Sequence, residues 1–488
     1  MLPADATLTN GTGTFSATLE SVNATYTITA TDTVSSSISG TSGDIAVSYA
    51  LPVAVDDTAY TTDHQPVTID VLANDTDPSG LTLTVISTTQ GKKGSVSINQ
   101  DGTVLYTPNA KPKGLKTQPN DQFTYTIDDG FGNTATATVS VRDTFVASAG
   151  SYDGLLVNLA PTNDDTGYLQ VKTDGTGKFK GTLYVGGVKF PVKGGFSDSG
   201  DYTGSVTRPG SSALAVQLHL DPGASTISGP IADASPNTFT SSVIAKKQVK
   251  AGSLAGSYTV ILPASSNFTG PNYPQGDGFA TMKISKKGKV TISGRMGDGT
   301  AFLSKTFLHA DSTFDLYASL YARTAPFAGS VSGALTFEDI TGVNASDADG
   351  AVAWFKPASI IDPIYPSGFA MNTTALVSHY QKPKAGHSVF TLVSGPDNGQ
   401  IILADDSTVE ASSTVTIKEN NLVTVSLPNT NKIQLSIIPA TGRISGSFLD
   451  PVSQTKQSFQ GVVFQKQNVG AGVYTSAPQS YYFVLTPN

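Results

Sequence analysis

The residues of this sequence whose types are best suited to chemistry are aspartates that stand beside turn-forming residues in its first third. Carboxylates, together with asparagine amides and backbone carbonyls, supply the six to eight oxygen atoms that calcium takes in proteins. Aspartate is also common in β-turns for purely backbone reasons, so turn formation remains the alternative explanation. The candidate calcium ligands are Asp56, Asp57, Asp75, Asp77, Asp101, Asp128 and Asp129.

A second group has the chemistry of a carbohydrate site, because sugar-binding modules present rows of exposed aromatic rings. In the segment 314–321, however, the residues alternate in a way that a buried strand explains more simply. A ligand platform and a protein core both stay open as interpretations. The candidate rings are Tyr317, Tyr321, Trp354 and Tyr365.

Enzyme signatures are missing from the sequence. The five histidines are scattered, cysteine is absent, and there is no H-E-x-x-H helix, nucleophile elbow, Walker A loop or dinucleotide fingerprint. A carboxylate pair of the glycosidase type remains open, because folding and not spacing brings such a pair together. We therefore predict no enzymatic activity and no catalytic residue.

The elements that would position these residues are β-strands. Polar and apolar residues alternate with a period of two in segments such as 123–127, 134–141 and 432–437, which places one face of each strand on a core. Turn signals recur at about the 8–12-residue spacing that is typical of sandwiches and barrels. The 48 glycines and 27 prolines favour turns over long helices. The sequence therefore predicts an all-β fold.

The charge balance and the apolar pattern exclude two kinds of partner. The chain has 30 basic and 38 acidic residues and a net charge of −8, whereas a nucleic-acid-binding protein needs a basic face. No segment approaches the ~18–20 consecutive apolar residues of a membrane helix. We expect neither nucleic-acid binding nor membrane insertion. A signal peptide is not visible either.

Changes of pattern divide the chain into five regions. Seven expected strands between 51 and 143 suit one immunoglobulin-like sandwich. The motif Ala-Gly-Ser-Tyr at 149–152 recurs at 255–258, and a weaker third copy follows, which predicts three related antiparallel β-meander modules, each a barrel or a sandwich. The regions are 1–50, a partial immunoglobulin-like repeat; 51–143, a cadherin-like or immunoglobulin-like sandwich; and 144–250, 251–382 and 383–488, the three modules.

Two motifs are specific enough to suggest a family: Val-Leu-Ala-Asn-Asp-Thr-Asp-Pro-Ser-Gly at 71–80 and Phe-Thr-Tyr-Thr-Ile-Asp-Asp-Gly at 123–130. Through them, residues 51–143 resemble the cadherin-like and immunoglobulin-like tandem repeats of large, adhesin-type bacterial surface proteins. Residues 144–488 resemble uncharacterised C-terminal β-modules of such proteins. In an immunoglobulin-like topology the loops that carry the seven aspartates share one pole. They would then form a calcium-stiffened joint with residues 1–50.

Residues 1–50 look like a truncated repeat of a related type, and a remnant of that size cannot bury both faces of its sheet. We expect this chain to be the C-terminal part of a longer protein, which would place the signal peptide upstream. The alternative is that a strand from another molecule completes the remnant, so that the protein self-associates by strand addition.

We therefore predict a non-enzymatic extracellular or cell-surface protein with an adhesive or stalk-like function. Its expected partner is a component of a cell surface or of the extracellular matrix, a polysaccharide among the candidates. One alternative is a carbohydrate-binding head on a secreted protein. Another is a structural subunit that assembles by strand complementation through residues 1–50.

Overall fold

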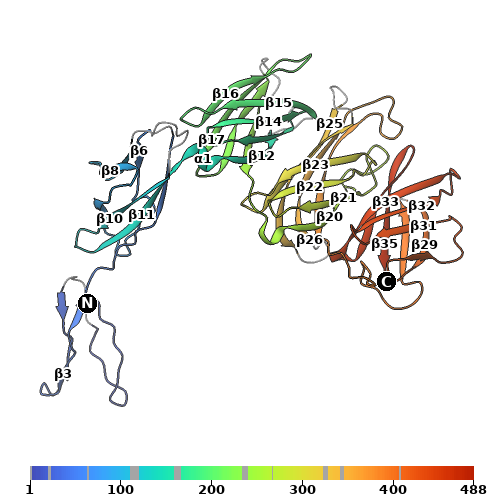
Figure 1. The fold of residues 1–488 in the computed structure, drawn as a ribbon. Coiled ribbons are helices and arrows are strands. Elements are labelled where there is room, and N and C mark those ends of the chain that lie inside the picture. The colour runs from blue at the N-terminus through green and yellow to red at the C-terminus, as the bar shows by residue number, and fades with distance from the viewer. Residues whose placement is uncertain are drawn as a thin grey trace. The chain divides into compact units, whose positions relative to one another are not determined.

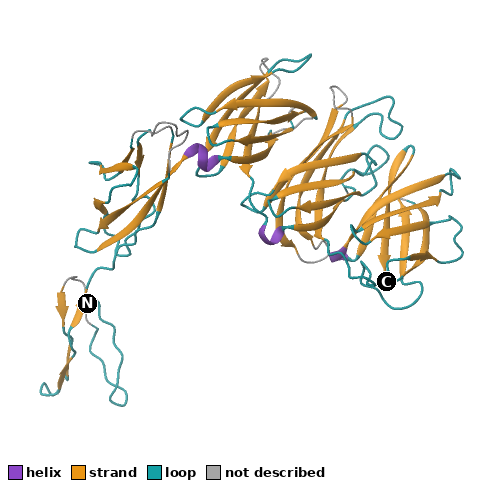
Figure 2. Cartoon of the chain, in the orientation of Figure 1, coloured by secondary structure: helices purple, strands orange, loops and turns teal. Residues whose placement is uncertain are grey.

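The computed structural model describes residues 3–19, 24–62, 65–109, 120–158, 166–233, 240–265, 267–321, 328–340, 346–405 and 408–488. Strands make up 55% of the structure and helices 2%, so the prediction of an all-β fold is confirmed (Figures 1 and 2). The chain forms two compact units, residues 1–147 and residues 148–488.

The first fifty residues form two small antiparallel pairs of strands and no core. Strand β1 (Ala24–Tyr26) pairs with β4 (Ile45–Val47), and β2 (Thr29–Thr31) pairs with β3 (Ser39–Thr41). No described residue from 3 to 51 is buried. The exposed apolar side chains of this region are Leu8, Phe15, Val34 and Ile38.

The remainder of the first unit is an immunoglobulin-like sandwich of two sheets, with strand orders β5-β11-β10-β7 and β6-β9-β8. Its core includes Tyr106, Phe123, Tyr125 and Val139, which alternate along their strands with residues that are mostly half-buried. The strands are β5 (Asp57–Thr61), β6 (Val67–Ile69), β7 (Thr84–Thr88), β8 (Gly94–Ile98), β9 (Val104–Pro108), β10 (Asp121–Asp128) and β11 (Thr134–Asp143), and the short helix α1 (Thr144–Ser148) follows.

The second unit contains three eight-stranded antiparallel sheets, which we call modules 1, 2 and 3. Module 1 comprises β12 (Gly150–Val157), β13 (Gly167–Thr173), β14 (Lys178–Val185), β15 (Val188–Gly195), β16 (Asp201–Val206), β17 (Leu214–Asp221), β18 (Thr226–Asp233) and β19 (Thr240–Lys247). Module 2 comprises the short 3-10 helix η1 (Gly252–Leu254) and β20 (Gly256–Leu262), β21 (Gly278–Ile284), β22 (Lys289–Arg295), β23 (Ala301–Phe307), β24 (Thr313–Tyr321), β25 (Ala328–Ile340), β26 (Ser346–Lys356) and β27 (Phe369–His379). Module 3 comprises β28 (Gly399–Ala404), β29 (Val409–Ile417), β30 (Val423–Val425), β31 (Gln434–Ile438), β32 (Arg443–Leu449), β33 (Lys456–Phe464), η2 (Gln465–Gln467), β34 (Val469–Ser476) and β35 (Gln479–Pro487).

The three modules share one strand order. In each sheet the first strand pairs with the last, as β12 does with β19, β20 with β27 and β28 with β35. The two edge strands of each sheet, such as β15 and β16, are therefore consecutive in the chain. Each sheet curls around its own core (Figure 2), as an up-and-down meander of this length can.

The repeated Ala-Gly-Ser-Tyr motif has a structural role that is the same in modules 1 and 2. Tyr152 and Tyr258 each lie in the first strand of a module, and each donates its hydroxyl hydrogen bond to the carbonyl four residues earlier, that of Ser148 or Leu254, at 2.8 Å. Because a buried tyrosine hydroxyl needs a partner, the motif fixes the entry of the chain into the sheet.

Strand β24 shows how the alternation of residues builds the second unit. Phe314, Leu316, Ala318 and Leu320 belong to the core of module 2. Successive side chains of a strand point to opposite faces, so the residues between them point away from that core. These residues, 315, 317 and 319, face module 1.

Candidate functional sites

A buried polar network joins module 1 to module 2 at the carboxylate of Asp153. The Asp153 side chain is fully buried, and the His309 Nε2 atom lies 2.7 Å from its Oδ1. The hydroxyls of Thr306, at 2.6 Å, and Tyr168 donate to its Oδ2, as does the Phe307 amide at 3.0 Å. Four donors from two modules therefore satisfy one carboxylate, as a buried charge requires.

A second acid in this interface, Asp315, is less well satisfied. It is 7% exposed, and its carboxylate makes no hydrogen bond among the described residues. Burial and, to a smaller extent, the charge of Asp153 raise the pKa of Asp315 to about 7, against the opposing influence of His309 and Lys246. Burial, together with Asp153, also holds the pKa of the Tyr168 hydroxyl well above its ordinary value.

The pair of Asp153 and His309 has the composition of a catalytic dyad but not its accessibility. The His309 side chain is 2% exposed and that of Asp153 is 0% exposed, so a substrate cannot reach either group. General acid–base catalysis needs the imidazole within hydrogen-bond reach of the reacting group. The pair therefore acts as an internal bond between the modules.

The junction of modules 2 and 3 is apolar instead. Ile261 and Phe279, from the first two strands of module 2, pack against four buried residues of β33 and β34. At its border the Tyr365 hydroxyl lies 2.9 Å from Oγ of Ser480 and accepts the Ser480 amide hydrogen bond at 3.0 Å. The four residues from module 3 are Val462, Phe464, Ala471 and Val473.

Six of the seven candidate calcium ligands accept hydrogen bonds from backbone amides, Asp75 among them, whose Oδ1 accepts from the Val55 amide at 2.7 Å. Oδ1 of Asp56 accepts from the Thr138 amide at 2.8 Å. The other four belong to turns, in which the carboxylate accepts from an amide two residues later: Asp77 from Ser79, Asp101 from Thr103, Asp128 from Gly130 and Asp129 from Phe131. This is the turn chemistry that the sequence left open as the alternative.

Asp57 is the seventh candidate, and it lies together with Asp75 near the Tyr125 hydroxyl. That hydroxyl is 3.0 Å from both carboxylate oxygens of Asp75 and from the carbonyls of Val55 and Val71, yet it carries one proton to donate. Oδ2 of Asp57 is buried without a hydrogen bond. Burial and, more weakly, the charges of Asp75 and Asp56 raise the pKa of Asp57.

The structure does not bring the seven carboxylates into one site. In the described part of the chain no three acidic or histidine side chains are close enough to hold a metal ion together. The loops of Asp77, Asp101 and Asp129 share a pole of the sandwich, as the topology requires, but the side chains turn back to their own backbone. Calcium binding thus stays a prediction, now centred on Asp57 and Asp75.

The four candidate sugar-binding rings do not form an exposed row. Trp354 is 3% exposed, Tyr365 2% and Tyr317 4%. Tyr321 is partly buried, accepts from Nε1 of Trp354 at 3.0 Å and donates to Asp298 at 2.9 Å. Nζ of Lys356 lies 4.1 Å from the centre of the Tyr321 ring. Three of these rings therefore belong to the interior of module 2 and its border.

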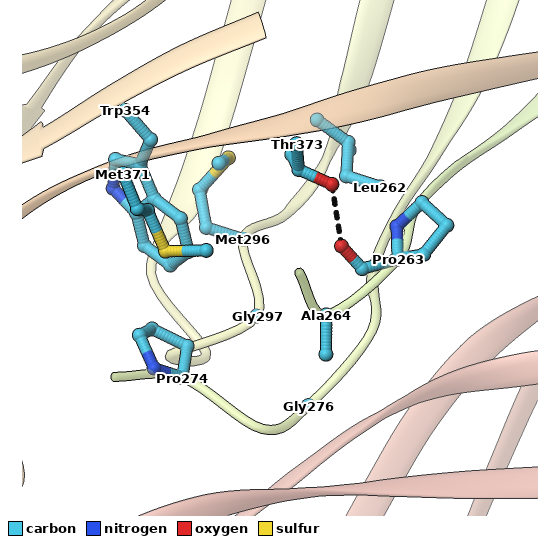
Figure 3. Close-up of a pocket in the computed structure, with 10 residues that line it drawn as sticks. All are labelled: Leu262, Pro263, Ala264, Pro274, Gly276, Met296, Gly297, Trp354, Met371 and Thr373. Carbon is cyan, nitrogen blue, oxygen red and sulfur yellow. Dashed lines mark hydrogen bonds between the residues drawn. The ribbon is translucent and has the colours of Figure 1, made fainter. Parts of the chain in front are cut away.

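The void beside Trp354 is too small for a ligand (Figure 3). It has a volume of about 10 Å³, roughly one water probe, and Met296, Met371 and Pro274 line it with the indole ring. Thr373 closes it from one side by donating to the Pro263 carbonyl at 2.6 Å. Tyr317 is different, because it lines a larger cavity between modules 1 and 2, described below.

Comparison with known proteins identifies the class of the first unit. Residues 50–142 match the model of the family described as Bacterial Ig domain, which agrees with the two-sheet sandwich observed there. This region is an immunoglobulin-like repeat of the bacterial type. Repeats of this family are typical of surface and adhesion-type proteins and are typically not enzymes. The match covers one region and not the three modules.

Two further comparisons do not extend this assignment to the rest of the chain. A solved structure titled "Protocadherin Gamma B2 extracellular cadherin domains 1-5" aligns with 90% of this chain and 80% of its own, at 11% identity and a TM-score of 0.13, which is too low to establish a common arrangement. No curated protein matches the sequence.

Proposed function

We propose that this protein is a non-enzymatic, adhesion-type protein of the bacterial cell surface, and that the second unit is its binding part. The single observation that carries the proposal is the bacterial immunoglobulin-like repeat at residues 50–142. Consistent with it, the acid–base pair of Asp153 and His309 is sealed from solvent. No helix in the described residues is long and apolar enough to cross a membrane.

The two module interfaces support a mechanical role. Displacing module 1 from module 2 would expose the Asp153 carboxylate and strip it of three donors from module 2, and an unpaired buried charge is costly. Displacing module 3 would expose the apolar cluster around Phe279. Both junctions therefore resist bending, and the three modules present their ligand-facing surfaces in a fixed relation.

Display of the protein on intact cells tests this proposal. An antibody raised against residues 148–488 should label intact cells that produce the protein. A matched antibody against a cytoplasmic protein should label them only after permeabilisation. Labelling by the first antibody that also needs permeabilisation would contradict a surface location.

Calcium at Asp57 and Asp75 is a proposal that rests on the oxygen atoms around Tyr125. The carboxylates of both residues and the carbonyl of Val55 surround one proton donor, and Oδ2 of Asp57 lacks a partner. Calcium prefers such oxygen ligands and would offset the repulsion between the carboxylates. When bound, it would stiffen the start of the sandwich next to residues 1–50.

Self-association through residues 1–50 is the second candidate function, and the burial pattern favours it. Val34 is 95% exposed and Ile38 64% exposed, and the two-stranded sheets have unpaired edges that can add a strand. Replacing both residues with serine should shift a concentration-dependent oligomer toward monomer in light scattering. A wild-type chain that stays monomeric up to high concentration would contradict this candidate.

A further inference from the structure

A half-open cavity of about 270 Å³ lies at the junction of modules 1 and 2, just below the range of about 300–1,000 Å³ for small-molecule sites. Strands β13, β14, β15, β23 and β24 contribute to it. The residues that define its chemistry are Tyr168, Gln170, Tyr184, Lys189, Lys305 and Tyr317.

Three tyrosine rings line this cavity, and Tyr184 is the most accessible of them because Tyr168 and Tyr317 are only 3% and 4% exposed. The rings of Tyr168 and Tyr317 are stacked, with centroids 5.3 Å apart and planes within 10°. The ring of Tyr184 lies 5.2 Å from that of Tyr317. Tyr168 and Tyr184 come from module 1 and Tyr317 from module 2, so this set of rings exists only while the modules are docked. Gly187 allows the two modules to approach closely, because any Cβ at this position would lie 2.5 Å from the Gly329 carbonyl oxygen.

Two lysines and one amide supply the polar part of the cavity. Lys189 and Lys305 come from different modules, are exposed, and form no ion pair among the described residues. The Gln170 amide is held in place, because its Nε2 atom donates to the Lys305 carbonyl at 3.2 Å and to the Tyr168 hydroxyl at 3.3 Å. The cavity thus combines fixed rings, a fixed amide and two unpaired cations.

The hydroxyls of Tyr317 and Ser319 are a second, independent sign of a site. Both oxygens are buried, and neither makes a hydrogen bond of acceptable geometry among the described residues. Burial raises the pKa of Tyr317 above its ordinary range. The Ser319 hydroxyl lies close enough to offset part of that increase. Buried hydroxyls without partners are rare and costly in native proteins, so these two mark a place beside the cavity where the docked modules leave polar groups unsatisfied.

We propose that this cavity binds an acidic sugar unit, a hexuronate of a polysaccharide. The C–H face of a pyranose ring packs on an aromatic ring such as that of Tyr184, its hydroxyls suit the Gln170 amide, and its carboxylate suits Lys189 and Lys305. A ligand without a ring would leave the Tyr184 ring unused, and a neutral sugar would leave both lysines unpaired. The proposal rests on the adhesive function above and names its ligand.

Calorimetric titration of the full chain with tetragalacturonate, and with the neutral cellotetraose for comparison, tests the site. The acidic tetrasaccharide should bind at least about tenfold more tightly than the neutral one. Replacing both Lys189 and Lys305 with glutamine should remove that preference, and because both side chains are exposed the variant should fold. Tyr184→Leu, which keeps bulk and loses the ring, should weaken binding of both sugars.

A matched control is available at the junction of modules 2 and 3, where Lys382 and Lys384 line an open groove of about 690 Å³. Replacing these two exposed lysines with glutamine removes the same charge and should leave the titration unchanged. Equal affinity for both tetrasaccharides, loss of binding in the control variant, or no binding would each overturn the proposal. If the lysine variants adhere to cells like the wild type, the sugar site is wrong while the adhesive function stands.

Discussion

Replacing Asp315 with asparagine should change the pH dependence of stability of module 2. The pKa of Asp315 in the folded protein is about 7, against an ordinary value of 3.8. Between these pH values Asp315 keeps its proton in the native state and loses it in the unfolded chain. The free energy of unfolding therefore falls as the pH rises from about 4 to about 7. Above that range this contribution no longer changes with pH. The difference of about three pKa units corresponds to about 4 kcal/mol as an upper figure.

Asparagine is uncharged throughout, so Asp315→Asn removes this contribution. The variant should be about as stable as the wild type at pH 4.5, where Asp315 is protonated and uncharged, and more stable than it at pH 8, where burial disfavours the ionised Asp315. Equilibrium urea unfolding followed by fluorescence measures this, because Trp354 is the only tryptophan and lies in the core of module 2.

Asp311→Asn is the matched control. Asp311 lies close to Asp315 in sequence, is about half exposed and pairs with Lys246 at 2.5 Å. Its partial burial would raise its pKa, but hydrogen bonds from Lys246 and Thr313 outweigh that effect and lower the pKa to about 2. Its stabilising effect is present above about pH 4 and is lost only as the pH falls toward 2, so this variant should keep the wild-type slope from pH 4.5 to 8. Parallel curves for the wild type and Asp315→Asn would refute the assignment of a protonated Asp315.

Three other predictions follow from close contacts. Phe279→Ala should lower the free energy of unfolding by about 3–5 kcal/mol, and calorimetry should show module 3 unfolding separately; an unchanged thermogram would contradict an apolar junction. Gly154→Ala should lower the thermal midpoint, because its Cβ would lie 2.5 Å from the Ile244 carbonyl oxygen, whereas Gly195→Ala should not, because the nearest atom to its Cβ would be Cγ of Lys178 at 3.9 Å. Millimolar calcium should raise the free energy of unfolding of the first unit, by about 2.7 kcal/mol at a hundredfold excess over Kd, and should raise its thermal midpoint accordingly; the same shift after replacing both Asp57 and Asp75 with asparagine would refute the proposed ligands.

The sequence predicted the strands well and their surroundings less well. Alternation identifies the face of β24 that carries Phe314 and Leu316, because that face packs on the core of its own module. It cannot distinguish solvent from a neighbouring module on the other face, where Asp315 and Tyr317 are buried. The interface residues were missed for this reason.

One signal in the sequence could have revealed the polar interface. The first two modules align through Ala-Gly-Ser-Tyr, and after that motif module 1 has Asp153 where module 2 has Thr259. Likewise Tyr168 of module 1 corresponds to Phe279 of module 2. Polar residues at positions that are apolar or uncharged in a sister repeat indicate a different neighbour. Both contact module 2, Asp153 through its hydrogen bond with His309 and Tyr168 through stacking on Tyr317.

The aspartates of the immunoglobulin-like repeat show a second limit of prediction from sequence, which concerns the direction of side chains in loops. The strand order puts the turns of Asp77, Asp101 and Asp129 at one pole of the sandwich. A carboxylate in a turn, however, reaches the amide two residues later before it reaches another loop. Convergence of loops therefore does not imply convergence of side chains, and only Asp57 and Asp75 share a neighbour, Tyr125.

The most direct test of the adhesive function is the binding of the purified full chain to an array of polysaccharides, mucins and matrix proteins. The account predicts saturable binding to at least one surface component. It also predicts that excess of a fragment of residues 148–488 competes with the full chain, because the second unit carries the binding surface. Absence of binding to every component, or binding that the fragment does not compete, would contradict the account.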